Sequence, residues 1–140
     1  MIALSPRCAV SFHTYSDLWL HPWGYQVTAT PDSNSFYEWD DEASTGLGYS
    51  AGQSTRVLYE VNGEFNDWCY GETVLKPRLF SWTPEMGSQN DGFWPPPSRI
   101  LPLANEGLRP CYTVAAIAGP YVRMERAEWT GGALLIGNLG

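Results

Sequence analysis

Short apolar runs, separated by proline, glycine and small polar residues, dominate the first part of the chain. The run CAVSFHTY at 8–15 predicts a buried strand, and DLWLHPWGY at 17–25 predicts a second short strand that ends at its proline. A third strand is predicted in KPRLFSWTPEMG at 76–87. His13 falls at the C-terminal end of the first strand, where open α/β sheets place their binding crevices, and Glu85 falls at the tip of the third.

Two other segments repeat apolar residues at helical spacing. Residues 35–45 predict a helix that begins with a capping box, in which Ser35 is paired with Glu38. Residues 101–118 predict a longer amphipathic helix, which Pro110 should kink because proline removes a helical hydrogen bond.

The segment before the third strand allows two interpretations. Residues 55–72 alternate in polarity around Asn62 and Gly63, which favours a hairpin with a tight turn, and a long mobile loop is the competing interpretation. Near the end of the chain, 121–126 and 132–140 predict two further strands. Together these elements predict an α/β fold, with a partial mixed β-sheet packed by helices.

Composition narrows the range of partners. The 140 residues fit a single domain, and 15 acidic against 8 basic residues give a net charge of -7. Such a chain lacks the basic surface by which proteins bind nucleic acid or anionic membranes. No apolar stretch reaches the roughly 18 residues of a spanning helix. Arg7 interrupts the first apolar run, so no signal peptide is visible. We expect no nucleic acid and no membrane partner.

The cysteines predict neither a disulfide framework nor a cysteine-ligated zinc site. Cys8, Cys69 and Cys111 are odd in number and lack C-x-x-C spacing. One pair could still form a bridge if the protein is secreted.

Taken alone, the residues at the strand ends do not decide a function. A single histidine is more often a hydrogen-bonded core residue than a metal ligand, and a single strand-end glutamate is usually a solvated carboxylate. The wider pattern is more specific. Four stretches occur in an order that resembles the zinc metallocarboxypeptidases of the carboxypeptidase A and T type: SFHTYSDLWLHPWGY, LYEVNGEFNDWCYGE, FSWTPEMGSQNDGFWPPPSRILPLANE and AGPYV. The resemblance spans residues 5 to 122, and TPE-x-G followed by GFWP is most similar to the bacterial carboxypeptidase T branch.

The resemblance implies a metal centre. His13 corresponds to the last of three ligands of one Zn²⁺ ion, whose fourth position is left open for water. Glu85 corresponds to the carboxylate that takes a proton from that water and returns it to the leaving amine. The other two ligands of the family belong to an H-x-x-E pattern, which does not occur in this sequence. His21 stands where the family usually has an aromatic residue, and we expect it at the surface and not as a ligand.

The resemblance also implies residues that bind substrate. Tyr59 matches the loop that folds over bound peptide, and its hydroxyl would bind the C-terminal carboxylate. Thr14 and Tyr15 would line the neighbouring subsite.

Asn66 matches the position at the base of the pocket that receives the C-terminal side chain. A neutral amide there favours neither basic nor apolar side chains. Glu60 and Glu64 would attract basic residues, so the sequence leaves the preference open.

The resemblance therefore predicts that residues 1–122 form the C-terminal half of a zinc carboxypeptidase catalytic domain and that 123–140 begin an appended β-sandwich or form terminal strands. The implied function is zinc-dependent hydrolysis that releases C-terminal amino acids from peptides and proteins, in a secreted or periplasmic location. The missing N-terminal half of the domain is then a required partner. A non-catalytic fragment that at most binds peptide is the alternative. A carbohydrate-binding β-module, suggested by 7 Trp and 8 Tyr, ranks behind both because two helices are predicted.

Overall fold

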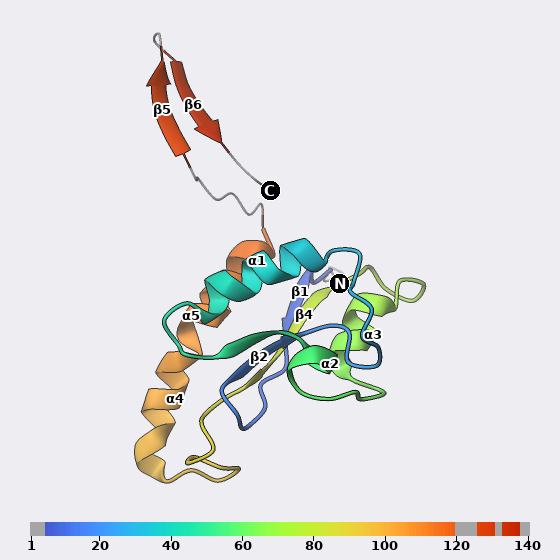
Figure 1. The fold of residues 1–140 in the computed structure, drawn as a ribbon, viewed down its shortest axis with the longest axis vertical. Helices are drawn as coiled ribbons and strands as arrows, with labels where there is room; N and C mark the ends of the chain where they lie inside the picture. Colours follow the sequence, from blue (N-terminus) through green and yellow to red (C-terminus); the bar gives the residue numbers. More distant parts are fainter. Residues whose placement is uncertain (1–4, 120–125, 131–132, 138–140) are drawn as a thin grey trace, which may run out of the picture.

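A mixed four-stranded sheet forms the centre of the fold (Figure 1). The computed structural model describes residues 5–119, 126–130 and 133–137. The strands are β1 (Cys8–Val10), β2 (Leu18–His21), β3 (Ser50–Gln53) and β4 (Phe80–Glu85), in the order β1-β4-β2-β3. β4 pairs parallel with β1 and antiparallel with β2, which pairs parallel with β3. The predicted α/β fold with a mixed sheet is confirmed.

Three of these strands lie where the apolar runs predict them, and β3 was not predicted. Its sequence, SAGQ, contains no β-branched or large apolar residue that would indicate a strand. It forms because it pairs in register with the fully buried β2, from Leu18 opposite Ser50 to His21 opposite Gln53.

Helices pack around the sheet. They are α1 (Ser33–Ser44), α2 (Ser54–Val57), α3 (Phe65–Gly71), the 3-10 turn η1 (Pro97–Arg99), α4 (Ile100–Glu106) and α5 (Leu108–Ile117). α1 and α5 lie side by side, α5 also contacts β1, and α3 packs against β4. Among the described residues, no helix is both long and apolar enough to cross a membrane.

The first predicted helix is confirmed as α1, but the predicted capping box is wrong. α1 begins at Ser33, and Asp32 stands at its N-cap without a side-chain cap hydrogen bond. The Asp32 carboxylate instead accepts a hydrogen bond from Tyr70 Oη at 2.6 Å and pairs with Arg78 at 3.2 Å. Tertiary contacts therefore use the carboxylate that would otherwise cap the helix.

The predicted hairpin around Asn62 and Gly63 is wrong. The segment instead contains α2, a connecting loop and α3, which begins at Phe65. Gly63 adopts a φ of +80°, which glycine tolerates, and so allows the loop to turn into the helix. Of the two interpretations, the loop describes residues 58–64.

The long helix predicted over 101–118 is divided in two, and the break lies at Gly107 and not at Pro110. Pro110 occupies the first turn of α5, where a backbone N–H has no intrahelical partner and its loss costs little. Gly107 lies between α4 and α5, where a Cβ would lie 3.5 Å from the ring of Phe12.

The aromatic core joins β2, β4, α1 and α3. Trp19 and Trp82 stack with ring centroids 6.1 Å apart, and Phe36 packs edge-on against both Trp82 and Tyr70. All four side chains are almost fully buried.

His21 belongs to this core, so its predicted surface position is wrong. Its side chain is 1% exposed and its Nδ1 lies 2.6 Å from Asp40 Oδ2. The other carboxylate oxygen of Asp40 accepts a hydrogen bond from Trp82 Nε1 at 2.9 Å. The imidazole stacks on Phe36 with a centroid distance of 4.7 Å, so it packs as an aromatic ring would at this place.

The end of the chain forms a separate antiparallel pair, β5 (Arg126–Thr130) and β6 (Ala133–Gly137) (Figure 1). The strand predicted over 132–140 is confirmed where it is described. Most of the strand predicted over 121–126 lies outside the described residues. The assignment of 123–140 to a β-sandwich or to terminal strands stays a prediction.

Candidate functional site

His13 and Glu85 are held next to each other by the backbone. An isolated parallel bridge pairs His13, which lies beyond the end of β1, with Glu85, the last residue of β4. The amide of His13 donates to the carbonyl of Pro84 at 2.9 Å, and the amide of Met86 donates to the carbonyl of His13 at 2.9 Å. The side chains also meet, with His13 Nδ1 3.7 Å from Glu85 Oε1. The distance between imidazole and carboxylate is thus set largely by the ends of two strands.

The two side chains differ in exposure. The imidazole of His13 is 54% exposed, and its Nε2 lies 3.2 Å from Ser11 Oγ. The carboxylate of Glu85 is only 15% exposed. Burial raises the pKa of Glu85, and the neighbouring His13 offsets part of that rise. A largely buried carboxylate with a raised pKa is suited to accept and return a proton.

One cavity of about 310 Å³ brings three predicted site residues together. His13 and Glu85 form part of its lining, and Tyr59 reaches it from the loop between α2 and α3. The remaining lining residues are Leu20, Leu58, Val61, Gly63, Glu64, Phe65 and Thr83. Tyr59 is 63% exposed, as is common for a side chain on a surface loop.

Asn66 lies behind this lining. It is fully buried in α3, and its Nδ2 donates to the carbonyl of Leu20 at 3.4 Å. Its Oδ1 has no hydrogen-bond partner among the described residues. The amide thus lies next to the cavity wall without itself lining the cavity.

Thr14 and Tyr15 lie on the other side of His13. Thr14 lines a second, more apolar cavity of about 460 Å³, together with His13, Phe12 and Met86. The ring of Tyr15 packs edge-on against Phe93 with a centroid distance of 4.9 Å. The structure therefore does not bring these two residues to the cavity that contains Tyr59.

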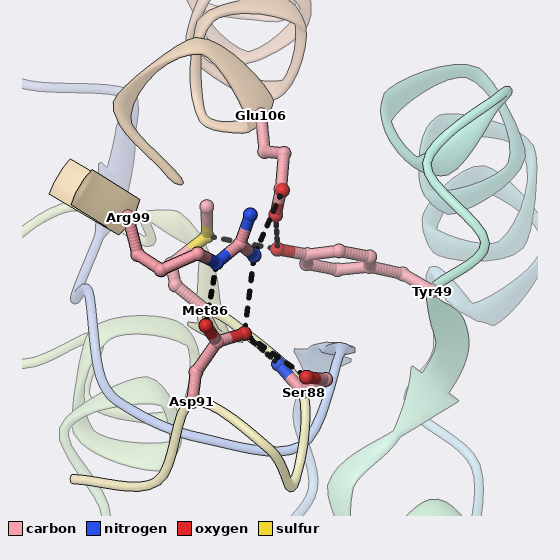
Figure 2. A network of polar contacts seen from close by, with 6 residues as sticks. All are labelled: Tyr49, Met86, Ser88, Asp91, Arg99 and Glu106. Carbon is pink, nitrogen blue, oxygen red and sulfur yellow. Dashed lines mark hydrogen bonds and ion pairs between the residues drawn. The ribbon is translucent and has the colours of Figure 1, made fainter. Parts of the chain in front are cut away.

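A polar network anchors the loop that follows Glu85 (Figure 2). Arg99 binds both oxygens of Asp91, which also accepts hydrogen bonds from the amide and hydroxyl of Ser88. Arg99 lies 3.6 Å from Glu106, which accepts a hydrogen bond from Tyr49 Oη at 3.0 Å. This network was not predictable from the sequence, because its members are scattered from 49 to 106 and no motif connects them.

Relatives identify the family. A sequence model of the family described as zinc carboxypeptidase matches residues 5–109. The chain belongs to the zinc carboxypeptidase family.

Two individual carboxypeptidases that match this family member support the assignment. It is 31% identical over 117 residues to a carboxypeptidase B from Astacus astacus, a match that covers 74% of this chain and 36% of the relative. It is 29% identical over 107 residues to the human carboxypeptidase A1, covering 71% of this chain and 25% of the relative. The chain thus spans about a quarter to a third of the curated relatives it matches.

The solved structures show the same fold. Bovine thrombin-activatable fibrinolysis inhibitor, in its complex with tick carboxypeptidase inhibitor, superimposes with a TM-score of 0.70 at 23% identity, covering 80% of this chain and 39% of the other. At this identity the likeness concerns the fold alone. The resemblance to the bacterial carboxypeptidase T branch stays a prediction.

The described residues of this carboxypeptidase family member do not by themselves complete a zinc site. A catalytic zinc takes three protein ligands. Within the described residues, no group of three His, Cys, Asp or Glu side chains could hold a metal ion. His13 offers one imidazole, and His21 is committed to Asp40 in the core. The cysteines Cys8, Cys69 and Cys111 are all free and are not gathered in one place.

Proposed function

We propose that this chain is part of a zinc-dependent carboxypeptidase that releases C-terminal amino acids from peptides, and that it contributes His13 as one zinc ligand. The observation that carries the proposal is the pairing of His13 with Glu85 across a backbone bridge, on the wall of a cavity that Tyr59 also lines. Family membership supports the reaction class. The two further ligands must come from outside the described residues.

In this proposal Glu85 moves protons. Zinc, when bound, supplies Lewis acidity that lowers the pKa of a coordinated water. The carboxylate of Glu85 accepts a proton from water held beside His13 and returns it to the leaving amine. Its partial burial supports this role, because a raised pKa makes the return of the proton easier.

Tyr59 and Asn66 act on the substrate in this proposal. The Tyr59 hydroxyl binds the C-terminal carboxylate when its loop closes over the peptide, and closure excludes water from the cavity. Asn66 supports the wall of the pocket for the C-terminal side chain through its contact with Leu20. Thr14 and Tyr15 contact the peptide on the other side of His13. A secreted or periplasmic location remains part of the proposal.

The second candidate function is a non-catalytic remnant that binds peptide. The observation in its favour is that the described part of the chain contains no group of three His, Cys, Asp or Glu side chains that could hold a metal ion.

A chimeric enzyme distinguishes between the two candidate functions. Residues 5–109 replace the matching segment of carboxypeptidase B from Astacus astacus, so that the host supplies the rest of the domain. The proposed function predicts release of C-terminal amino acids that is abolished by a zinc chelator and restored by zinc. A chimera that shows one cooperative unfolding transition and binds one zinc, yet releases no amino acid, would support the remnant instead.

A further inference from the structure

The turn that follows His13 has an unusual backbone. Ser16 and Asp17 have φ angles of +149° and +51°, in the region that favours glycine. Such conformations persist only where the surrounding structure holds them. The turn carries Thr14 and Tyr15 and leads directly into β2. The contacts that hold this turn therefore decide where Thr14 and Tyr15 lie.

The carbonyl of Gly87 holds the turn. It accepts hydrogen bonds from the amide of Ser16 at 2.8 Å and from the amide of Asp17 at 3.0 Å. Gly87 has a φ of +86°, and a Cβ at this position would lie 3.2 Å from the Cβ of Asp91 and 3.2 Å from Leu103 Cδ2. Glycine is therefore the residue that can present this carbonyl to the turn without strain.

Asp91 fixes the residue next to Gly87. Its Oδ2 accepts hydrogen bonds from the amide of Ser88 at 2.9 Å and from the hydroxyl of Ser88 at 3.0 Å. The side chain of Asp91 is 6% exposed, and Arg99 binds both of its oxygens, with Nε 2.5 Å from Oδ1 and Nη2 3.1 Å from Oδ2 (Figure 2). Two parallel hydrogen bonds of this kind fix the orientation of a carboxylate as well as its position. Asp91 and Arg99 thus hold the backbone that presents the Gly87 carbonyl.

The segment between these two residues also contacts the turn through a side chain. Phe93 lies within residues 88–99, and its ring packs edge-on against the ring of Tyr15 with a centroid distance of 4.9 Å. A backbone contact and a side-chain contact therefore both join residues 88–99 to residues 14–17. A shift of this segment would move the turn at two places.

Arg99 is a cation among carboxylates. It lies 3.6 Å from Glu106. Burial raises the pKa of Asp17, and the negative charges of Glu106 and Asp91 raise it further, whereas the charge of Arg99 lowers it. A neutral residue in place of Arg99 would leave these carboxylates without that compensation. Lysine keeps the positive charge but loses the planar fork that binds both oxygens of Asp91, so Arg99→Lys tests the geometry of the pair and not its charge.

We propose that Asp91 is a positioning residue, which holds residues 14–17 in the conformation that contacts peptide through the carbonyl of Gly87. The inference rests on the proposed function, because Thr14 and Tyr15 contact peptide only in that proposal. Asp91 acts through the backbone and does not touch the reacting atoms. Its loss should have two effects, a more mobile turn and weaker binding of peptide.

NMR relaxation of backbone amides in the 140-residue chain tests the first effect without zinc or turnover. The amides of Ser16 and Asp17 should have order parameters of about 0.85 in the unmodified chain, and Asp91→Asn should lower them to below about 0.6. Arg99→Lys should act in the same direction, and it decides the test if Asp91→Asn does not fold. Unchanged order parameters at these two amides would overturn the inference.

Arg109→Lys is the matched control. Arg109 binds the backbone carbonyl and the carboxylate of Glu42, so it also makes two hydrogen bonds, but it joins α5 to α1. The control should leave the order parameters of Ser16 and Asp17 unchanged. An equal loss of order in Arg109→Lys would show a general loosening of the fold and would overturn the assignment to Asp91.

Steady-state kinetics of the chimera tests the second effect, at a temperature below the unfolding transition of the variant. Asp91→Asn should raise KM by about tenfold and leave kcat within about twofold, because lost ground-state binding raises KM. A merely structural role would reduce the amount of active enzyme and so lower the apparent kcat at an unchanged KM. Turnover with unchanged KM would overturn the inference alone. Absent turnover together with a mobile turn in Asp91→Asn would overturn the proposed function and support the positioning of the turn.

Discussion

His13 and Glu85 face each other across a parallel bridge, with Nδ1 and Oε1 3.7 Å apart. Glu85 is the last residue of β4 and His13 lies three residues after β1 of the same sheet, so packing of the sheet sets their separation. In the proposed function the two residues have different tasks, because His13 binds the metal and Glu85 transfers the proton.

Glu85→Gln in the chimera should abolish nearly all turnover while zinc content stays normal. The amide keeps the size of the side chain but cannot accept a proton, and roles of this kind are worth about 10² to 10⁴ in rate. Zinc content by atomic absorption and release of C-terminal amino acids are measured on the same sample. Loss of zinc together with activity would show that Glu85 is a ligand, and unchanged turnover would remove it from the mechanism.

Tyr59→Phe should mainly raise KM. The side chain is exposed on a loop. In the proposed function its hydroxyl binds the peptide and takes no part in the proton transfer, and loss of such binding raises KM. Steady-state kinetics of the chimera with a series of peptides measures the effect. A collapse of kcat at unchanged KM would place Tyr59 in the transition state.

The 140-residue chain alone should bind zinc no better than an exposed histidine and should not hydrolyse peptides. Only His13 is matched to a zinc ligand, and a catalytic site needs three from the protein. Calorimetric titration with zinc, with His13→Ala as the control, measures the first part and a peptide assay the second. Stoichiometric sub-micromolar binding with turnover would show that other groups of this chain complete the site.

Asp91→Asn should lower the Tm by several degrees at neutral pH. The difference in Tm between the variant and the unmodified chain should become smaller at acidic pH. Hydrogen bonds from Arg99 hold the pKa of Asp91 well below its ordinary value of 3.8. Asp91 therefore contributes stability that is fully present above pH 3.8 and is lost as the pH falls below it towards the lower pKa of the folded chain.

Thermal unfolding at a series of pH values measures this dependence. Glu42→Gln is the control, because the ion pair of Glu42 with Arg109 is exposed and should change the Tm by less than about 2 °C. An Asp91→Asn difference that stays constant with pH would contradict the assignment of the effect to the Asp91 charge.

The sequence indicated those parts of the fold that depend on strong local patterns. β1, β2 and β4 were predictable because each is an apolar run that ends in proline, glycine or small polar residues. β3 and α3 were not, since SAGQ carries no strand pattern and α3, with 7 residues, is too short to show helical periodicity. Tertiary packing therefore decided both.

The residues in and around the candidate site were likewise predictable only in part. His13, Glu85 and Tyr59 were predicted as site residues from ordered motifs, and all three line one cavity in the structure. The buried pair of His21 and Asp40 was missed, because the two residues are 19 positions apart and meet only when α1 packs against β2. Sequence alone does not show which polar residues will find partners in a core.

The two backbone hydrogen bonds that flank the bridge allow amide hydrogen exchange to report whether the strand ends at His13 and Glu85 stay paired. The amide protons of His13 and Met86 are both bonded across the bridge, so their exchange with deuterium requires the strand ends to separate. Substitutions of the His13 or Glu85 side chains leave these main-chain bonds free to form. Protection at these two amides therefore distinguishes a variant that has lost a functional group from one in which the strands themselves have come apart.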